Sequence, residues 1–471
     1  MRLTDKKYIY FPLLMLLSAQ AGAVEDLQPP TTGQEEMQES FLLGHSFFKD
    51  AKITGSVDYF QRRRDRRDLD DNNKYRRNLD HTTLHSSINF DSGFFNDVIG
   101  FNLGFYGNTD LRNKAAPDHE MNFEPWRDPW HPNWSRQDPN GGASYSRAHF
   151  KFRYSNFWAK LGYFQPSGPG ILGVNWSISP GTYRGAEIGG DFDTEYGKLS
   201  TAIAIVDKYK APWFKRQYRF YQNDGETKVN YVYSLGVRYA LKNNLTFDVA
   251  FGQSEGYFTN GHVKVSYHTP VKSGNLNLAY QFYAVDDSDN SGSINDNFDS
   301  LSYQHVLRSG YHIDAWTFTA EFSYTAAPMS NANQLGYFVY RPASPFGSSG
   351  GAYDIWWNAR SDWNHDKEKA IFVKVDRTLN DLGLRGWSAG VSYAHGWGGR
   401  AFGVDETLRE HAFNADITYK VPSGRFKDTS LNIHWTTYKN KTNQRSWEGF
   451  KNAFQDEKDI KIFLTMPFSI K

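Results

Sequence analysis

Residues 148–154 read AHFKFRY, so that every second residue is apolar and the residues between them are cationic. A repeat of two places successive side chains on opposite faces of a β-strand. The same alternation recurs from about Ala51 onward, for example in LNLAYQF at 276–282, WTFTAEFSY at 316–324 and IKIFLTMPF at 460–468. The pattern predicts an all-β chain whose strands each have one apolar face, and Phe150, Phe152, Leu278, Phe318, Leu431 and Ile462 belong to that face.

The connections between these stretches alternate between short and long, which distinguishes a barrel from a soluble β-sandwich. Long polar or Gly-rich connections, such as 112–144 and 328–368, lie between eight short ones. The short ones are at 94–98, 155–156, 195–198, 242–244, 272–275, 313–315, 380–386 and 423–427. Short periplasmic turns and long extracellular loops are typical of outer-membrane barrels. We therefore predict a single transmembrane antiparallel β-barrel of about 18 strands, with nine long loops.

The N-terminal stretch predicts export. Basic residues at 2, 6 and 7 precede a short apolar run at 8–17 and an A-x-A cleavage site at Ala21–Ala23. This is the layout of a signal peptide, and the run is too short for the alternative, a membrane anchor. We expect a signal peptide at 1–23, a periplasmic lead-in at 24–50 and the transmembrane barrel at 51–471. The expected location is the bacterial outer membrane.

Composition and motifs argue against enzymatic chemistry. The chain has no Cys, and its 53 Lys and Arg against 52 Asp and Glu leave a net charge of +1. These values exclude disulfides and thiol catalysis and give no basis for a nucleic-acid partner. No GxSxG or HExxH motif occurs, and the His residues show no metal-ligand spacing. We expect no catalytic residue, cofactor or metal site, although calcium held by loop carboxylates remains open.

Several segments resemble a known family, and the likeness runs from about Phe47 to the C-terminus. The chain is similar to the OprD-type family of substrate-specific outer-membrane porins and, within it, to the enterobacterial chitoporins. The segments that carry the resemblance are LGYFQPSGPGILGVNWSISPGTYRG (161–185), YKAPW (209–213), FYQND (220–224), FGQSEGY (251–257), DIWWNARSD (354–362) and FQDEKDIKIF (454–463).

The resemblance implies a monomeric barrel that is narrowed by an inward-folded third loop and has basic residues along its inner wall. It further implies passive uptake of chitooligosaccharides, which are N-acetylglucosamine oligomers, into the periplasm. The expected partners are outer-membrane lipid and lipopolysaccharide, together with the barrel-assembly machinery. The alternative within the family is a porin for amino acids, peptides or small carboxylates. Outside it, a barrel enzyme and an adhesion barrel with a plugged lumen remain as other hypotheses.

The polar half of the strand at 148–154 supplies candidate pore-lining residues. If the apolar half faces lipid, the cationic half faces the lumen, where it attracts anions and the dipoles of hydroxyl and acetamido groups. The alternative is that these residues fill the wall as ion pairs. The residues are Arg147, His149, Lys151 and Arg153.

Two loops supply candidate substrate-binding residues. In the connection at 166–184 and just beyond it, Trp176 and Tyr183 offer flat faces to a sugar ring, and Arg184 and Glu187 offer hydrogen-bonding groups. In the long seventh connection, Trp356, Trp357 and Arg360 form a second such group. The alternatives are an ordinary outer loop in the first case and aromatic residues that only pack the loop in the second.

Overall fold

The computed structural model describes most of the chain after residue 45. The described residues are 46–114, 123, 141–174, 178, 180–288, 293–329, 336–343, 351–401, 403–443 and 455–470. The signal peptide and nearly all of the periplasmic lead-in lie outside them and stay predictions. Among the described residues, no helix combines the length and the apolar character needed to cross a membrane.

The regular elements of the described chain are β-strands apart from a short helix α2 (Ser46–Lys49) and a 3₁₀ turn η1 (Asn380–Leu382). The strands are β1 (Lys52–Arg67), β2 (Tyr75–Asp91), β3 (Ile99–Lys114), β4 (Gly141–Tyr154), β5 (Phe157–Phe164), β6 (Thr182–Asp193), β7 (Gly197–Lys210), β8 (Tyr218–Tyr221), β9 (Lys228–Val229), β10 (Val232–Leu241), β11 (Leu245–Ser254), β12 (Phe258–Val271), β13 (Gly274–Asp287), β14 (Ser302–Ile313), β15 (Trp316–Ala326), β16 (Lys369–Thr378), β17 (Trp387–Ala401), β18 (Val404–Lys420), β19 (Ser430–Asn440) and β20 (Glu457–Ser469).

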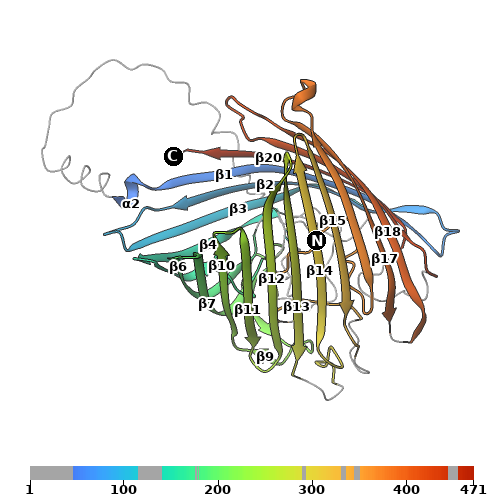
Figure 1. Ribbon diagram of the computed structural model, residues 1–471, viewed down its shortest axis with the longest axis horizontal. Helices are drawn as coiled ribbons and strands as arrows, with labels where there is room; N and C mark the ends of the chain where they lie inside the picture. Colours follow the sequence, from blue (N-terminus) through green and yellow to red (C-terminus); the bar gives the residue numbers. More distant parts are fainter. Residues whose placement is uncertain are drawn as a thin grey trace, which may run out of the picture. The chain divides into compact units, whose positions relative to one another are not determined.

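The sheet closes on itself. Each strand except β9 pairs antiparallel with the next, β7 also pairs with β10, and β8 and β9 form a small hairpin beside the wall. The first strand pairs with β2 on one side and with β20 on the other, from Thr54–Ser469 to Arg66–Glu457. Figure 1 shows β20 beside β1, with the other strands following in chain order. The remaining 18 strands therefore form one antiparallel barrel, as the sequence predicted.

The eight short turns lie where the sequence placed them, at the barrel end that also holds α2 and the end of β20. Three of them contain only two residues, and each begins with a positive φ: 53° at Ser155, 55° at Lys272 and 51° at Asp314. A positive φ gives a tight turn the twist of the two strands that it joins.

The nine connections at the opposite end are less uniform than expected. Those at 68–74, 255–257 and 402–403 are short, so the expectation of nine long loops was wrong for three of them. The first joins β1 and β2, which are 16 and 17 residues long. A transmembrane strand needs only about 9–11 residues. The residues that we expected in a long loop therefore belong to β1 and β2, which continue past the membrane.

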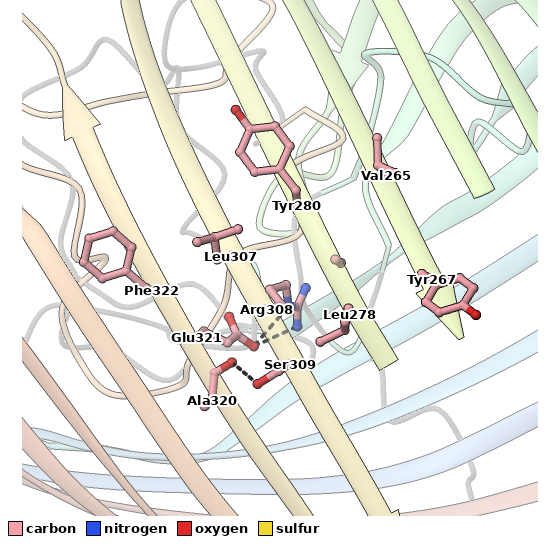
Figure 2. A pocket seen from close by; sticks show the side chains of 11 residues that line it. Val265, Tyr267, Leu278, Tyr280, Leu307, Arg308, Ser309, Ala320, Glu321 and Phe322 are labelled. Carbon is pink, nitrogen blue, oxygen red and sulfur yellow. Dashed lines mark hydrogen bonds and ion pairs between the residues drawn. The ribbon is translucent and has the colours of Figure 1, made fainter. Parts of the chain in front are cut away.

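The apolar half of each strand faces outward, as predicted. Phe150, Leu278 and Phe318 are exposed on the wall, and register places Phe152, Leu431 and Ile462 on the same face. Figure 2 shows part of this wall, a shallow groove lined by Tyr280, Leu307 and Phe322 from three neighbouring strands. Its apolar lining is what a lipid-facing surface requires.

Loop 3 (165–181), loop 7 (327–368) and the connection at 211–231 all contribute described residues to the barrel interior. Ile171 and Leu172 of loop 3 and Tyr340 and Trp357 of loop 7 belong to one buried cluster, which also includes wall residues such as Tyr283. This cluster positions the candidate site, because it fixes both loops inside the lumen.

Candidate functional site

Loop 3 folds into the barrel and is bound to the wall through hydrogen bonds. The backbone N–H groups of Ser167 and Gly168 donate to Glu187 on β6, each at 3.0 Å. The N–H of Ile171 donates to Ser234 Oγ on β10 at 2.9 Å. The expected inward-folded third loop is therefore present.

A glycine on the wall makes this close approach possible. A Cβ atom at Gly236 of β10 would lie 2.2 Å from the backbone carbon of Pro169 in loop 3. Any side chain there would push the loop into the lumen. Gly236 could not be singled out from the sequence, because a glycine in a strand does not reveal which segment approaches it.

Loop 7 also lies inside the barrel, where residues 353–361 follow the inner wall from β12 to β20. Near one end, Lys264 on β12 pairs with Asp354 at 2.6 Å. Midway, Trp357 Nε1 donates to Glu321 on β15 at 2.7 Å. Toward the other end, Lys461 on β20 donates to Asn358 Oδ1 at 2.6 Å. We call residues 353–361 the loop 7 belt. The sequence predicted a sugar-binding group in a long outer connection, whereas the belt lies within the lumen.

A chamber of about 440 Å³ lies between loop 3 and the wall. Loop 3 contributes residues 167–169 to its lining. The wall contributes several charged side chains, namely Lys151, Arg153, Lys160, Asp191 and Arg238. Two of the four predicted pore-lining residues, Lys151 and Arg153, therefore line a cavity on the inner face.

Each cation of the chamber has an acidic partner. Lys151 pairs with Asp91, and Arg153 pairs with Asp97 at 2.7 Å. Lys160 Nζ lies 3.4 Å from Glu187, and Arg238 Nη2 lies 2.5 Å from Asp248. These residues thus also fit the alternative of wall-filling ion pairs, and the chamber offers many donors and acceptors with little excess charge.

The other two residues of the stripe are less accessible. His149 is buried, and its Nδ1 lies 3.1 Å from the Tyr163 carbonyl oxygen, which fixes the ring on the wall. Arg147 shares the inward face of β4 and is half-buried. The structure therefore places all four on one face but brings only Lys151 and Arg153 to the chamber.

Three predicted substrate-binding residues at 183–187 contact the protein itself in ways that the sequence did not predict. The buried Tyr183 donates its hydroxyl to the Gly173 carbonyl at 2.8 Å, and the buried Glu187 holds loop 3. Arg184 lies three residues from Glu187 and so faces outward with Ile188, where it pairs with Asp207. A lumen contact for Arg184 was therefore wrong. Trp176 lies outside the described residues, and its role stays a prediction.

The two tryptophans of the loop 7 belt face opposite ways. The side chains of Ile355 and Trp357 are 8% and 7% exposed, whereas Trp356 between them is 59% exposed. Trp357 stacks on Phe372 of β16 with ring centroids 5.3 Å apart, which fits the loop-packing alternative. Trp356 instead points away from the wall that anchors its neighbours. Arg360 is half-buried and pairs with Glu457 of β20, so it anchors the belt.

Comparison with known sequences places this geometry in context. Residues 45–470 match the model of the OprD family, described as outer membrane porins. A protein from Escherichia coli strain K12 named chitoporin is 36% identical over 439 residues, which cover 90% of this chain and 92% of that protein.

Several solved structures share the fold. OpdK from Pseudomonas aeruginosa, crystallised with vanillate, superposes with a TM-score of 0.69 at 17% identity, covering 90% of this chain and 100% of that one. OccAB1 from Acinetobacter baumannii superposes with a TM-score of 0.69 at 17% identity, covering 90% of this chain and 98% of that one. OccK2 from Pseudomonas aeruginosa, in complex with glucuronate, superposes with a TM-score of 0.66 at 13% identity, covering 90% of this chain and 100% of that one.

Proposed function

The chain belongs to the OprD family of outer-membrane porins, and from that premise we propose that it carries chitooligosaccharides passively into the periplasm. As a substrate-selective porin it is a channel and not an enzyme. The 36% identity to a chitoporin over most of both chains supports the choice of substrate.

The balance of charge around the lumen is the observation that carries the proposal. Lys151, Lys160 and Arg238 near loop 3, and Lys264 and Arg360 near loop 7, are each paired with a carboxylate. Such a wall presents hydrogen-bond donors and acceptors without a strong net field. A neutral, hydroxyl-rich and acetamido-rich solute suits it better than a fully charged one, which gains most from an unbalanced field.

Trp356 supplies the apolar surface that a sugar ring needs. Its indole projects from a belt that is tied to the wall on both sides, so the ring is held in place before the solute arrives. A pyranose can lay its C–H face on the indole while its polar edge contacts the paired charges. Passage requires binding that is strong enough to favour entry and weak enough to allow exit.

The experiment is current blockage of single channels in planar bilayers. We expect chitooligosaccharides to cause transient blocks that lengthen with chain length, and glucose oligomers of equal size to cause few. Trp356→Ala should shorten the blocks about tenfold, because losing one sugar-covered aromatic face costs roughly 1–2 kcal/mol.

Trp387→Ala is the matched control, because Trp387 is an exposed tryptophan that follows a periplasmic turn and packs on Tyr419. Its block lifetimes should equal those of the wild type. Equal blocking by chito- and malto-oligosaccharides would reject the substrate. An unchanged Trp356→Ala response would remove Trp356 from the site and leave Trp176 as the remaining predicted platform.

A second candidate is a channel for small carboxylates or amino acids. The observation that favours it is the similarity of the fold to OpdK crystallised with vanillate and to OccK2 in complex with glucuronate. Blocks by these acids, at concentrations where chitooligosaccharides cause none, would select this candidate.

A further inference from the structure

Three buried side chains that the transport path does not use meet where loop 7 leads back into the wall. His365 and Glu368 lie on the last residues of loop 7 before β16, and Glu410 lies on β18. All three are fully buried. One possible ligand atom from each lies within 4.8 Å of the others.

The geometry of the pair on loop 7 suits a common ligand. His365 Nδ1 lies 3.2 Å from Glu368 Oε2, and the backbone N–H of His365 donates to the same oxygen at 3.0 Å. Ligands about 2.0–2.1 Å from a tetrahedral ion stand roughly 3.4 Å apart. The imidazole and the carboxylate are therefore already spaced as two corners of such a site.

Neighbouring hydroxyl groups orient the third carboxylate. Ser361 Oγ donates to Glu410 Oε1 at 2.7 Å, and the Tyr438 hydroxyl donates to Oε2. A carboxylate has about four acceptor positions, so both oxygens can still accept another partner. Hydrogen bonds to ligating groups are characteristic of metal sites, where they fix the ligand's direction.

The charge of the cluster is not balanced by basic side chains. In the part of the chain that the structure describes, neither Glu368 nor Glu410 forms an ion pair with a lysine or arginine, and Glu368 Oε1 has no hydrogen-bond partner. The buried Asp459 and Glu457 nearby are paired with Arg62 and Arg66. A cation bound between Glu368 and Glu410 would give these two buried carboxylates the charged partner that they lack.

We propose that His365, Glu368 and Glu410 bind one divalent transition-metal ion of the Zn²⁺ type. One imidazole and two carboxylates are ligands that Zn²⁺ takes in proteins. The ion would join the end of loop 7 to β18 and so help to hold the loop 7 belt in the lumen. No metal site was predicted from the sequence. Glu410 lies in a distant strand, and only an H-x-x-E spacing marks His365 and Glu368.

The test measures Zn²⁺ binding to the full-length barrel in detergent after removal of metals with a chelator. Calorimetric titration should show one saturable Zn²⁺ per chain, and Zn²⁺ should raise the midpoint of thermal unfolding. Glu410→Gln and Glu368→Gln should each weaken the affinity at least about 100-fold, because loss of an orienting neighbour alone costs about 10–100-fold. Tyr438→Phe should fall in that smaller range.

The variant Glu321→Gln is the matched control. Glu321 is another buried glutamate that holds the loop 7 belt, through Trp357, and it lies outside the cluster. It should keep the wild-type affinity for Zn²⁺. Glu410→Gln is expected to fold, because it removes one of two like charges and its amide can donate to Glu368 Oε1. Should it fail to fold, His365→Gln replaces it in the titration.

Equal Zn²⁺ affinity in the wild type and in the ligand variants would overturn the proposal, and so would a wild type that binds no Zn²⁺. The test does not depend on the transported solute. A chain that ignores chitooligosaccharides can still bind Zn²⁺ here, so the two proposals can fail separately.

Discussion

The carboxylate of Glu187 anchors loop 3 to the barrel wall. It is buried in β6, and it accepts hydrogen bonds from two backbone N–H groups of loop 3 while Lys160 lies 3.4 Å away. A buried charge is costly unless its lone pairs are used, and these partners use them. The residue that we expected to contact the solute thus has a second task, which is to hold the loop.

We expect Glu187→Gln to loosen loop 3. Hydrogen bonds to a charged acceptor contribute about 1.5–3 kcal/mol, and the amide keeps one oxygen but loses the charge. The free energy of unfolding measured with denaturant should fall by about 1–3 kcal/mol, and the noise of the open-channel current should increase. Asp193→Asn, at the exposed end of the same strand, should change neither quantity. Identical current noise in Glu187→Gln and the wild type would contradict this role.

At the scale of single residues, the alternation with a period of two predicts which face of a strand a side chain occupies, but not which residue it contacts. It correctly placed His149, Lys151 and Arg153 on the inner side. Applied from Glu187, it also places Arg184 outside, since residues three apart on a strand face opposite ways. It could not separate Trp356 from Trp357, because their exposure depends on how a loop meets a wall formed by distant strands.

At the scale of the strands, the short turns were predictable, and the upper ends of the strands were not. Alternation between apolar and polar residues exists only where one face meets lipid. Beyond that level both faces of β1 and β2 are polar, as in Arg63–Arg67 and Tyr75–Asn78, and the signal disappears although the pairing continues. The chain from 61 to 77 therefore reads as a charged loop while most of it is strand.

Strand orientation leads to a test of the lipid-facing wall. Leu307 is exposed in the middle of β14 and lies between Tyr280 and Phe322, as Figure 2 shows. Leu307→Arg should lower the free energy of unfolding in lipid vesicles by about 2–4 kcal/mol, because the guanidinium would face hydrocarbon. Ser266→Arg, on the lumen face of β12, should cost far less. A reversed order of the two would mean that the faces are assigned wrongly.

An aspartate helps to join two outer connections of the barrel. Asp224 of the connection at 211–231 accepts a hydrogen bond from Asn295 Nδ2 at 3.0 Å, and its own N–H donates to Asn295 Oδ1 at 3.0 Å. Burial opposes ionisation of Asp224, but hydrogen bonds from Thr227 and Asn295 outweigh it and lower the pKa to about 2. The ionised form therefore supports this contact.

The sign of the pH effect follows from that lowered pKa. The contact should be fully stabilised above pH 3.8, the ordinary value, and lost as the pH falls toward about 2. Hydrogen exchange of the amides at 222–227, corrected for intrinsic rates, should accelerate between pH 5 and pH 2. Asp224→Asn should exchange quickly at both. Constant protection in the wild type would show that the carboxylate does not hold the contact.

At the scale of the whole molecule, the barrel wall was predictable from the sequence, and the arrangement of the lumen was not. Strand number and topology follow from local patterns that repeat along the chain. The lumen depends on loop 3 and loop 7, whose segments reach strands far away in sequence, as Lys264 reaches Asp354 and Glu457 reaches Arg360. No local pattern records such contacts, and they decide which solute fits.

The seam between β1 and β20 determines when the barrel can close. Its pairs join Thr54 to Ser469 and Tyr59 to Leu464, roughly 400 residues apart along the chain. The ribosome finishes one edge of this seam near the start of translation and the other only at its end. Until then the nascent polypeptide has two unsatisfied strand edges, which invite aggregation. Distant pairings also form slowly. We therefore expect the chain to reach the outer membrane with this seam still open and to close into a barrel only there.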